Sequence, residues 1–260
     1  MGVKMWEIYD ALIEEIPDDL TVDEIVVGNG ITYVESNGGG GSAPYRNYTE
    51  RAPQYEGNKL DLSLKEVAEL VKSWNFVEAS VGNAALLAYY NHPDRARAKG
   101  ILSSDKNRVE DRLKDPFINS QKEIQGKKVC VVGHFPLIEN LFEPVCDLSI
   151  IEWNPFAGDF PYTACDFLIP ESDYVYITCA SIADKSLPHL LELSENAKKI
   201  TMVGPATPLA EQFFDFGIDD LSGFVILDNE RAKRIVSGAE FQRIYAAGKK
   251  VNYLSSSRSE

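Results

Sequence analysis

The sequence predicts an α/β protein in which a small α+β domain precedes a domain built on a parallel sheet. Helical periodicity and one β-rich pair of segments occupy residues 1–100. From residue 126 onward, short apolar runs alternate with segments long enough for crossovers, which is the pattern of a parallel sheet with helices on its faces. We therefore predict domains at 1–100 and 126–260, joined by a charged connecting segment at 101–125.

Composition and charge exclude several classes of partner. The chain of 260 residues has 26 Lys plus Arg against 40 Asp plus Glu, a formal charge of -14 and a pI near 4.7. Such a charge repels phosphate backbones and anionic lipid, so we expect neither nucleic acid nor a membrane as partner. No apolar run approaches the roughly 18 residues that span a bilayer, and the amino end lacks the pattern of a signal peptide. These observations predict a cytoplasmic protein.

The amino-terminal domain is predicted from periodicity and turn residues. Apolar residues at helical spacing predict a helix over 5–16, which Pro17 ends. Two β-rich runs around Gly28-Asn29-Gly30 predict a hairpin, and a low-complexity glycine run, 38–41, follows it. Helices are then expected across 63–91, starting at a Ser63–Glu66 capping box. Small residues at 79–85 would let a second backbone approach, either from the other domain or from another subunit.

Strands are predicted at 128–132, 148–153, 174–178, 199–204 and 224–227. In a doubly wound sheet, ligands bind outside the carboxyl ends of the strands, so the loops that follow these runs are the candidate site. Those loops include Gly133-His134-Phe135-Pro136, Ser181 and Gly204 to Pro208. We predict Pro136 at the first position of a helix, where its missing N–H costs nothing, and Thr207 as an N-cap. Because free N–H groups at a helix amino end favour an anion, these loops could bind one.

The first loop begins like a dinucleotide-binding loop but lacks the later glycines. Phe135 and Pro136 stand where those glycines would let a pyrophosphate approach, which disfavours NAD. Glu152 points the other way, because it follows Gly133 at about the 20-residue spacing of an acidic residue that binds a ribose hydroxyl. A nucleotide- or S-adenosylmethionine-dependent enzyme therefore remains an alternative.

His134 is the candidate catalytic residue, since an imidazole at this position could act as acid, base or metal ligand. The other histidines, His92 and His189, occupy ordinary helical contexts. The four cysteines match no short-spaced zinc or redox motif, and Cys130 and Cys179 lie in apolar runs typical of core thiols. A metal site would have to be assembled from distant residues.

Several stretches together resemble one known family: "KSWNFVEASVGNAALLAYYN", "RVEDRLKDPF", "GKKVCVVGHFP", "LSIIEWNP", "SDYVYITCAS" and "VGPATPL". The chain resembles the putative heavy-metal chelation proteins, in which an enolase N-terminal-like α+β domain precedes a Rossmann-like α/β domain. The resemblance implies a site between the two domains and a role in handling heavy metals. The implied lining is His134 and Phe135 beside Gly133, then Asn154, Pro155, Ser181 and Thr207, faced by Glu78, Ser80 and Asn83.

Three functions remain open. The first is binding of a small anionic molecule, a heavy metal ion or a metal chelate in the interdomain cleft, either as an enzyme in metal or cofactor handling or without chemistry. The second is the nucleotide- or S-adenosylmethionine-dependent enzyme motivated by Glu152. The third is a non-catalytic homo-oligomeric binding protein, for which a homodimer is the commonest form.

Overall fold

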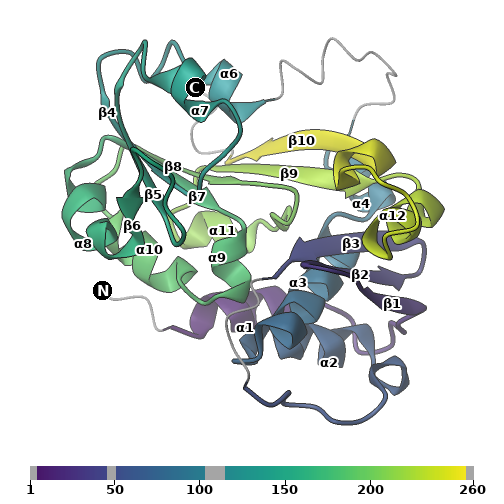
Figure 1. Cartoon of the computed structure of the whole chain (residues 1–260). Coiled ribbons are helices and arrows are strands. Elements are labelled where there is room, and N and C mark those ends of the chain that lie inside the picture. The colour runs from purple at the N-terminus through teal and green to yellow at the C-terminus, as the bar shows by residue number, and fades with distance from the viewer. Residues whose placement is uncertain (1–4, 46–50, 103–114, 256–260) are drawn as a thin grey trace.

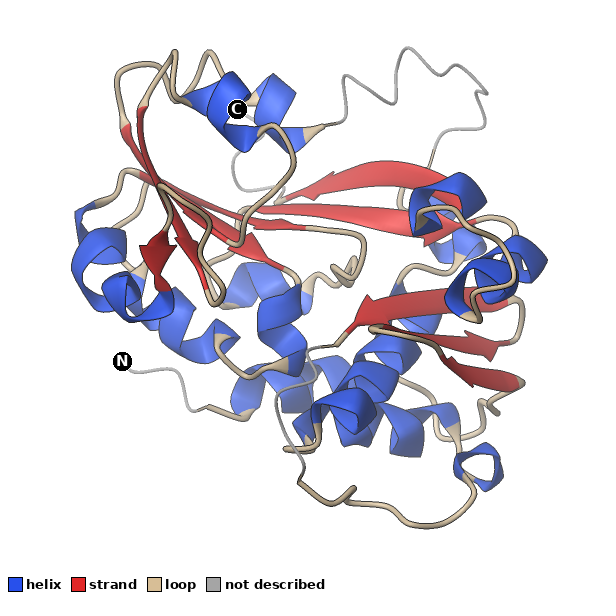
Figure 2. Cartoon of the chain, in the orientation of Figure 1, coloured by secondary structure: helices blue, strands red, loops and turns tan. Residues whose placement is uncertain are grey.

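The computed structural model describes residues 5–45, 51–102 and 115–255, and it shows an α/β protein with two sheets (Figures 1 and 2). The small sheet is antiparallel, with strand order β1-β2-β3. The large sheet has the order β10-β9-β8-β7-β4-β5-β6 and is parallel except for the edge strand β10. The predicted fold class is confirmed.

The first part of the chain contains α1 (Glu7–Glu14), β1 (Glu24–Val27), β2 (Ile31–Ser36), β3 (Gly39–Pro44), α2 (Leu64–Glu69), α3 (Phe76–Tyr90) and α4 (Pro93–Ala98). The second part contains α6 (Pro116–Asn119), β4 (Lys128–Val132), α7 (Ile138–Phe142), β5 (Asp147–Glu152), β6 (Phe160–Pro161), α8 (Cys165–Leu168), β7 (Tyr174–Thr178), α9 (Ala180–Ala183), α10 (Leu187–Leu193), β8 (Lys199–Val203), α11 (Gln212–Asp215), β9 (Asp220–Ile226), α12 (Asn229–Val236) and β10 (Gly248–Leu254). No helix of these described ranges is long and apolar enough to cross a bilayer.

The glycine run is a strand rather than a loop. It forms β3, which pairs with β2 and packs on α3. A Cβ at Gly41 would lie 2.0 Å from the carbonyl oxygen of Ala84, and one at Gly39 would lie 2.3 Å from that of Ala88. Only glycine permits this close approach of strand and helix.

The small residues of α3 are used inside the chain. Gly82 lies against the backbone of Val71, where a Cβ would come within 2.0 Å of the amide nitrogen. Ala79, Ala84 and Ala85 are fully buried. The close approach that these residues allow therefore serves intramolecular packing, which removes the sequence argument for a subunit contact here.

Helix α12 crosses the predicted domain division. It follows β9 in the chain but packs on the small sheet, on the opposite side from α3, where Ala232 and Val236 join a cluster with Tyr33 (Figure 1). The amide of Asn229 donates to Glu35 Oε1 and to the carbonyl of Gly38. The largest hydrophobic cluster also contains residues from both sheets. The division at 101–125 stays a prediction, and the two sheets share one core.

The predicted strands of the large sheet agree closely with β4, β5, β7 and β8, whereas β9 begins at Asp220, before the predicted 224. Two strands were not expected: the two-residue β6 and the edge strand β10. The sequence prediction looked for parallel strands joined by crossovers. Strand β10 instead follows α12 and pairs antiparallel with β9, so it did not fit that pattern.

The two faces of the large sheet differ in chemistry. Side chains that point toward α9, α10 and α11 are apolar along the sheet, including Cys130, Val175, Met202, Leu221 and Val251. The alternate residues are apolar on β4 and β7 near α6 and α7. On β8, β9 and β10 they include polar residues such as Thr201, Ser222 and Asn252 as well as the apolar Val203 and Phe224. We call the first the apolar face and the second the mixed face. The cavities described below over β8–β10 lie on the mixed face.

Candidate functional site

The loop after β4 holds His134 between two carboxylates. Its Nδ1 lies 3.0 Å from Asp159 Oδ2, and its Nε2 lies 3.3 Å from Glu139 Oε1. The Asp159 side chain is almost fully buried and also accepts a hydrogen bond from the backbone N–H of Phe156. The Phe156 ring packs edge-on against the imidazole, with centroids 4.8 Å apart. His134 is thus fixed in orientation by its contacts with Asp159, Glu139 and Phe156.

This arrangement limits what the imidazole can do. The Nδ1 contact with Asp159 is a hydrogen bond, and because an ionised carboxylate only accepts, Nδ1 is its donor. Nε2 is the ring nitrogen left for a ligand, and Glu139 lies 3.3 Å from it. A catalytic role for His134 stays a prediction.

Glu152 is engaged by its own loop. Its Oε2 accepts from the backbone N–H of His134 at 3.1 Å, and its Oε1 accepts from that of Trp153 at 2.7 Å. These bonds join the loops that follow β4 and β5. Glu152, whose spacing from Gly133 suggested a contact with a ribose hydroxyl, therefore has a structural role in this protein. Asn154 is exposed on the same loop, between Trp153 and the segment that brings Asp159 to His134.

The helix predicted to start at Pro136 starts later. Gly133 (φ 104°) and Leu137 (φ 68°) both adopt left-handed backbone, and α7 begins at Ile138 with only five residues. A helix this short supplies little of the dipole on which the anion argument rested. Phe135 instead packs its ring against Phe117 of α6, with centroids 5.0 Å apart.

The prediction that Thr207 caps a helix is wrong. Residues 207–210 are not helical, and the next helix, α11, begins at Gln212. The backbone here is bound instead by Asn91 at the end of α3, whose amide donates to the carbonyl of Thr207 and whose Oδ1 accepts from the N–H of Leu209. A long-range side chain thus replaces the helical hydrogen bonds. Thr207 Oγ1 is buried without a hydrogen-bond partner among the described residues.

The other predicted loop residue, Ser181, points inward. It is fully buried, and its hydroxyl donates to the carbonyl of Thr178 at 2.7 Å. Asn83 of α3 reaches the same region and donates weakly to the carbonyl of Ala206 at 3.5 Å. Asn83 and the 204–210 segment therefore meet, as the resemblance implied, but in a closed contact with Asn83 1% exposed.

Glu78 and Ser80 do not face these loops. Glu78 accepts hydrogen bonds from the N–H groups of Gln54 and Tyr55 and forms an ion pair with Lys59. Ser80 is buried behind the small sheet, where its hydroxyl contacts Thr32 Oγ1 at 2.7 Å and donates to the carbonyl of Ala43. Both residues thus hold the amino-terminal part together, so their predicted substrate contacts lack geometric support.

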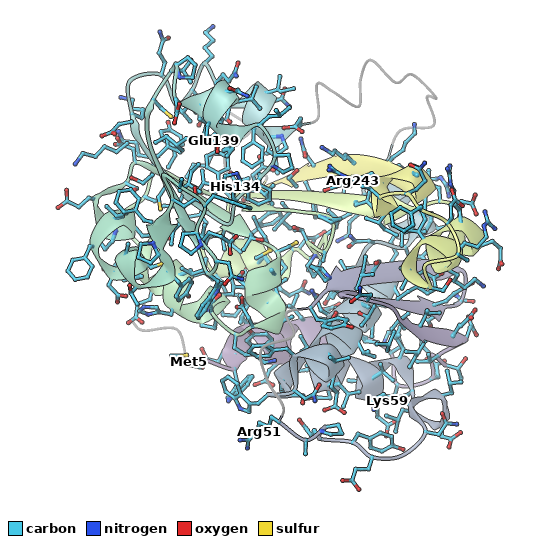
Figure 3. All side chains as sticks on the ribbon, viewed as in Figure 1. Met5, Arg51, Lys59, His134, Glu139 and Arg243 are labelled. Carbon is cyan, nitrogen blue, oxygen red and sulfur yellow. The ribbon has the colours of Figure 1, made fainter. Side chains whose placement is uncertain are left out.

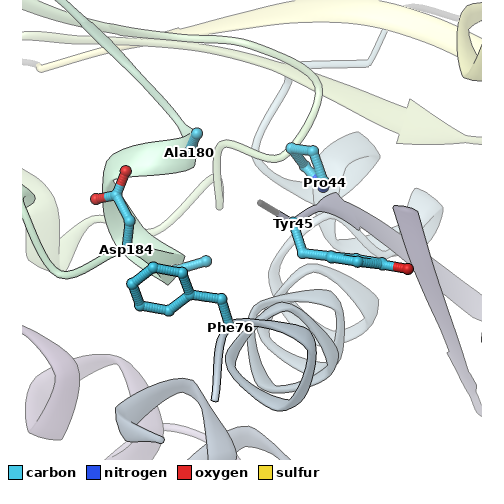
Figure 4. A pocket seen from close by; sticks show the side chains of 6 residues that line it. Pro44, Tyr45, Phe76, Ala180 and Asp184 are labelled. Atoms are coloured by element: carbon cyan, nitrogen blue, oxygen red, sulfur yellow. The ribbon is translucent and has the colours of Figure 1, made fainter. Parts of the chain in front are cut away.

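A cavity of about 200 Å³ does lie between the two parts of the chain (Figure 4). Figure 4 shows Pro44 at the end of β3, Tyr45 directly after it and Phe76 at the start of α3, facing Ala180 of α9 and Asp184, which follows that helix. Its walls are mainly apolar, and none of the predicted site residues lines it. The interdomain space therefore offers little to hold an anion.

A second cavity, of about 210 Å³, lies on the mixed face at the carboxyl ends of β4 and β8, and we call it the carboxyl-end cavity. Its lining residues are Asp115, Pro116, Phe117, Phe135, Pro136, Val203, Gly204, Ser222, Gly223, Arg243, Tyr245 and Lys250. Gly204 has φ 132°, and a Cβ there would lie 2.4 Å from Cys179 Sγ. Glycine is therefore needed for the turn that shapes the cavity wall.

Two cations reach the carboxyl-end cavity. Lys250 on β10 donates to Asp115 Oδ2 at 2.9 Å, so its charge is largely balanced. Arg243 precedes a short 3-10 helix, is exposed to solvent, and forms no ion pair with any carboxylate of the described residues. In Figure 3, His134, Glu139 and Arg243 lie toward one side of the molecule and Lys59 toward the other. The cavity thus combines an unbalanced guanidinium with a glycine turn at the edge where parallel sheets bind ligands.

The donor set does not fit a heavy metal bound by protein side chains. Within the described ranges, no group of three or more His, Cys, Asp or Glu residues is arranged to hold a metal ion. Burial raises the pKa of the Cys165 and Cys179 thiols to about 12, raises that of Cys130 further, and raises that of the half-buried Cys146 to about 11. Because the thiolate is the metal ligand, these protonated thiols are poor donors.

Comparison with known proteins identifies the family. Residues 115–255 match the DUF364 family model and residues 9–90 match the DUF4213 model, and both carry the description "Putative heavy-metal chelation". The first match covers more than half of the chain, so the chain belongs to the DUF364 family. The resemblance that the sequence motifs suggested is confirmed.

The chain is similar to proteins whose activity is also not established. A solved DUF364 protein of unknown function from Desulfitobacterium hafniense is 55% identical, with a TM-score of 0.89 over 96% of this chain and 99% of that one. A DUF364 protein of unknown function from Pyrococcus horikoshii has the same fold. Its TM-score is 0.72 at 19% identity, over 96% of this chain and 99% of that one. An uncharacterized protein of Methanocaldococcus jannaschii is 26% identical over 208 residues, covering 75% of this chain and 74% of that protein.

Of the lining that the resemblance implied, only Phe135 lines the carboxyl-end cavity, and Pro136 and Gly204 of the predicted loops line it as well. Sequence reasoning missed Arg243 and Lys250 because it ended the sheet at residue 227. The signal that could have found them is the alternation in "GKKVNYL", where Lys250 and Asn252 share one face of a strand and Val251 and Tyr253 share the other.

Proposed function

We propose that this protein binds a small organic anion in the carboxyl-end cavity. The observation that carries the proposal is the Arg243 guanidinium, which lines the cavity without a carboxylate partner among the described residues. A guanidinium binds carboxylate or phosphoryl oxygens through two parallel hydrogen bonds. In a chain with a formal charge of -14, an unbalanced cation at this position favours an anionic ligand.

Cavity size restricts the ligand. A volume of about 210 Å³ is below the roughly 300–1,000 Å³ of pockets that hold drug-sized ligands, so a whole dinucleotide does not fit. Phe135 and Pro136 form part of the wall, in accord with the earlier argument against a pyrophosphate. An anionic metal chelate with exposed carboxylates would present to Arg243 the same negative charge as a small organic anion. That reading agrees with the family description without requiring a protein side chain to ligate the metal.

His134 has a positioning role in this proposal. Its ring, held by Asp159 and Glu139, fixes the loop whose next two residues form the cavity wall. That the protein is a cytoplasmic homodimer stays a prediction from the sequence.

Isothermal titration with citrate, with ferric citrate and with inorganic phosphate tests the proposal. We expect at least one of these anions to bind, and Arg243→Ala to weaken it by about 1.5–3 kcal/mol, or roughly 10- to 100-fold, because a charged hydrogen-bond partner is lost. Arg97→Ala is the matched control, since Arg97 is an exposed arginine on α4 that pairs with Asp94. Equal binding by the Arg243→Ala variant, or no heat with any of the three anions, would refute the proposal.

A further inference from the structure

A neighbouring cavity on the mixed face has the opposite charge character. It has a volume of about 160 Å³ and lies between the α6 region and strands β7 to β10. Its polar walls include Glu123, Tyr176, Lys199, Thr201, Asp220 and Asn252. Lys250 of the carboxyl-end cavity lies two residues before Asn252 on β10, on the same side of the strand. We call this second space the Asp220 cavity.

Asp220 is the unusual group in this cavity. The residue is 8% exposed, and its Oδ1 is buried with no hydrogen-bond partner in the described part of the chain. Its Oδ2 lies 3.8 Å from Lys199 Nζ, beyond hydrogen-bond distance. Buried carboxylates normally accept hydrogen bonds at both oxygens, because an unsatisfied charged acceptor is costly. Asp220 therefore lacks a hydrogen-bond donor at Oδ1, and its side chain, 11% exposed, lines the cavity.

The charge balance around Asp220 is also incomplete. Lys199 is shared between Asp220 and Glu123, whose Oε2 lies 3.4 Å from its Nζ. One cation thus faces two carboxylates. Burial is the main cause that raises the pKa of the Asp220 carboxyl to about 6; Lys199 opposes this shift, and Glu123 and Asp219 contribute to it. A second positive charge in the cavity would complete the balance.

The shape and the ligand set favour an organic cation over a metal ion. The described residues include no metal-holding group of three or more carboxylates, imidazoles or thiols. The cavity is larger than a single ion requires, and Pro116 and Leu254 add apolar wall beside the polar groups. An alkylammonium group would place three N–H donors near Asp220 and its carbon chain against this wall.

We propose that the Asp220 cavity binds the protonated primary amine of a small organic molecule, with Asp220 and Glu123 accepting its hydrogen bonds. This site is separate from the carboxyl-end cavity and does not depend on the proposed anion function. Thr201 and Tyr176 supply hydroxyl groups to the same space and would select ligands with a further polar group.

Titration with n-propylammonium, followed by the backbone amide resonances of the folded protein, tests this inference. We expect saturable shifts centred on Thr201, Asp220 and Asn252, and none with neutral 1-propanol at the same concentrations. Asp220→Asn should weaken propylammonium binding at least tenfold. Asp166→Asn, which changes an exposed aspartate on α8, should leave it unchanged.

Three results would overturn the inference. These are the absence of saturable shifts with propylammonium, equal shifts with 1-propanol, and undiminished affinity in the Asp220→Asn protein. A thermal melt of Asp220→Asn guards against misfolding. Since the substitution keeps the side-chain shape and removes a poorly solvated charge, we expect its Tm to match or exceed that of the unmodified protein.

Discussion

The two faces of the large sheet are built from alternate residues of the same strands but serve different purposes. On β8, Ile200 and Met202 join the main core of the apolar face, whereas Lys199 and Thr201 line the Asp220 cavity on the mixed face. On β9, Leu221 belongs to the core and Ser222 to the carboxyl-end cavity. A strand buried on both faces would read as a continuous apolar run. The alternation here indicates that one face contributes stability, whereas the other lines the two cavities that we propose as ligand sites.

The strongest test of this contrast compares stability on the two faces. Leu221→Ala removes a fully buried side chain from the apolar face and should lower the free energy of unfolding by about 2–5 kcal/mol, because it leaves a cavity. Lys250→Ala on the mixed face of β10 should lower it by less than about 1 kcal/mol, since its pair with Asp115 is partly exposed. Urea unfolding measures both values. Similar losses for the two variants would contradict the division of roles.

A smaller effect is expected from the pH dependence of Asp220. Its pKa rises from 3.8 to about 6 on folding, so the folded protein holds this proton more tightly than the unfolded chain. Stability should therefore fall as pH rises between about 4 and 6 and then level off. The loss is about 3 kcal/mol at most for a shift of this size.

Asp220→Asn isolates this contribution. The difference in unfolding free energy between the variant and the unmodified protein should grow in favour of the variant from pH 4 to pH 6 and stay constant above that. Comparing the two proteins cancels the titration of the other carboxylates. A difference that does not change with pH would mean that Asp220 finds its missing donor in solvent.

The smallest expected signal is thiol reactivity. Cys130 and Cys179 lie on the apolar face and Cys165 packs in the same cluster, so none should react with Ellman's reagent in the native protein. Cys146 is half-buried and donates its S–H to the carbonyl of Phe142, so it should react slowly. All four should react in urea, which serves as the control. Rapid labelling of Cys130 or Cys179 would show that the apolar face opens.

Local patterns in the sequence predicted most helices and strands correctly, but they missed β3 and predicted a helix start at Thr207 that does not form. The Ser63–Glu66 capping box is present, and β4, β5, β7 and β8 lie close to their predicted positions. The glycine run did not reveal β3, because the glycines are required by the close approach of the α3 backbone, more than 40 residues away in the chain. Thr207 and Pro208 have the local pattern of a helix start, but Asn91 supplies hydrogen bonds that favour extended backbone.

The candidate site shows the same limit more strongly. The sequence predicted a site at the carboxyl edge of the sheet and singled out the loop at His134, because strand–loop–helix order places strand ends together. It could not show that Asp159 and Glu139 contact the two ring nitrogens of His134, or that Glu152 accepts hydrogen bonds from the loops after β4 and β5. These contacts join different loops, and no periodicity encodes them.

What the sequence determined by itself is the α/β class, the family and the approximate positions of β4, β5, β7 and β8, since these follow from short-range alternation and motif identity. Tertiary structure alone decided which side of each strand faces a helix and which faces a cavity. It also decided that Arg243 lacks a carboxylate partner among the described residues while Lys250 has one. The physical reason is that burial and charge balance depend on neighbours from distant parts of the chain, which only the folded packing brings together.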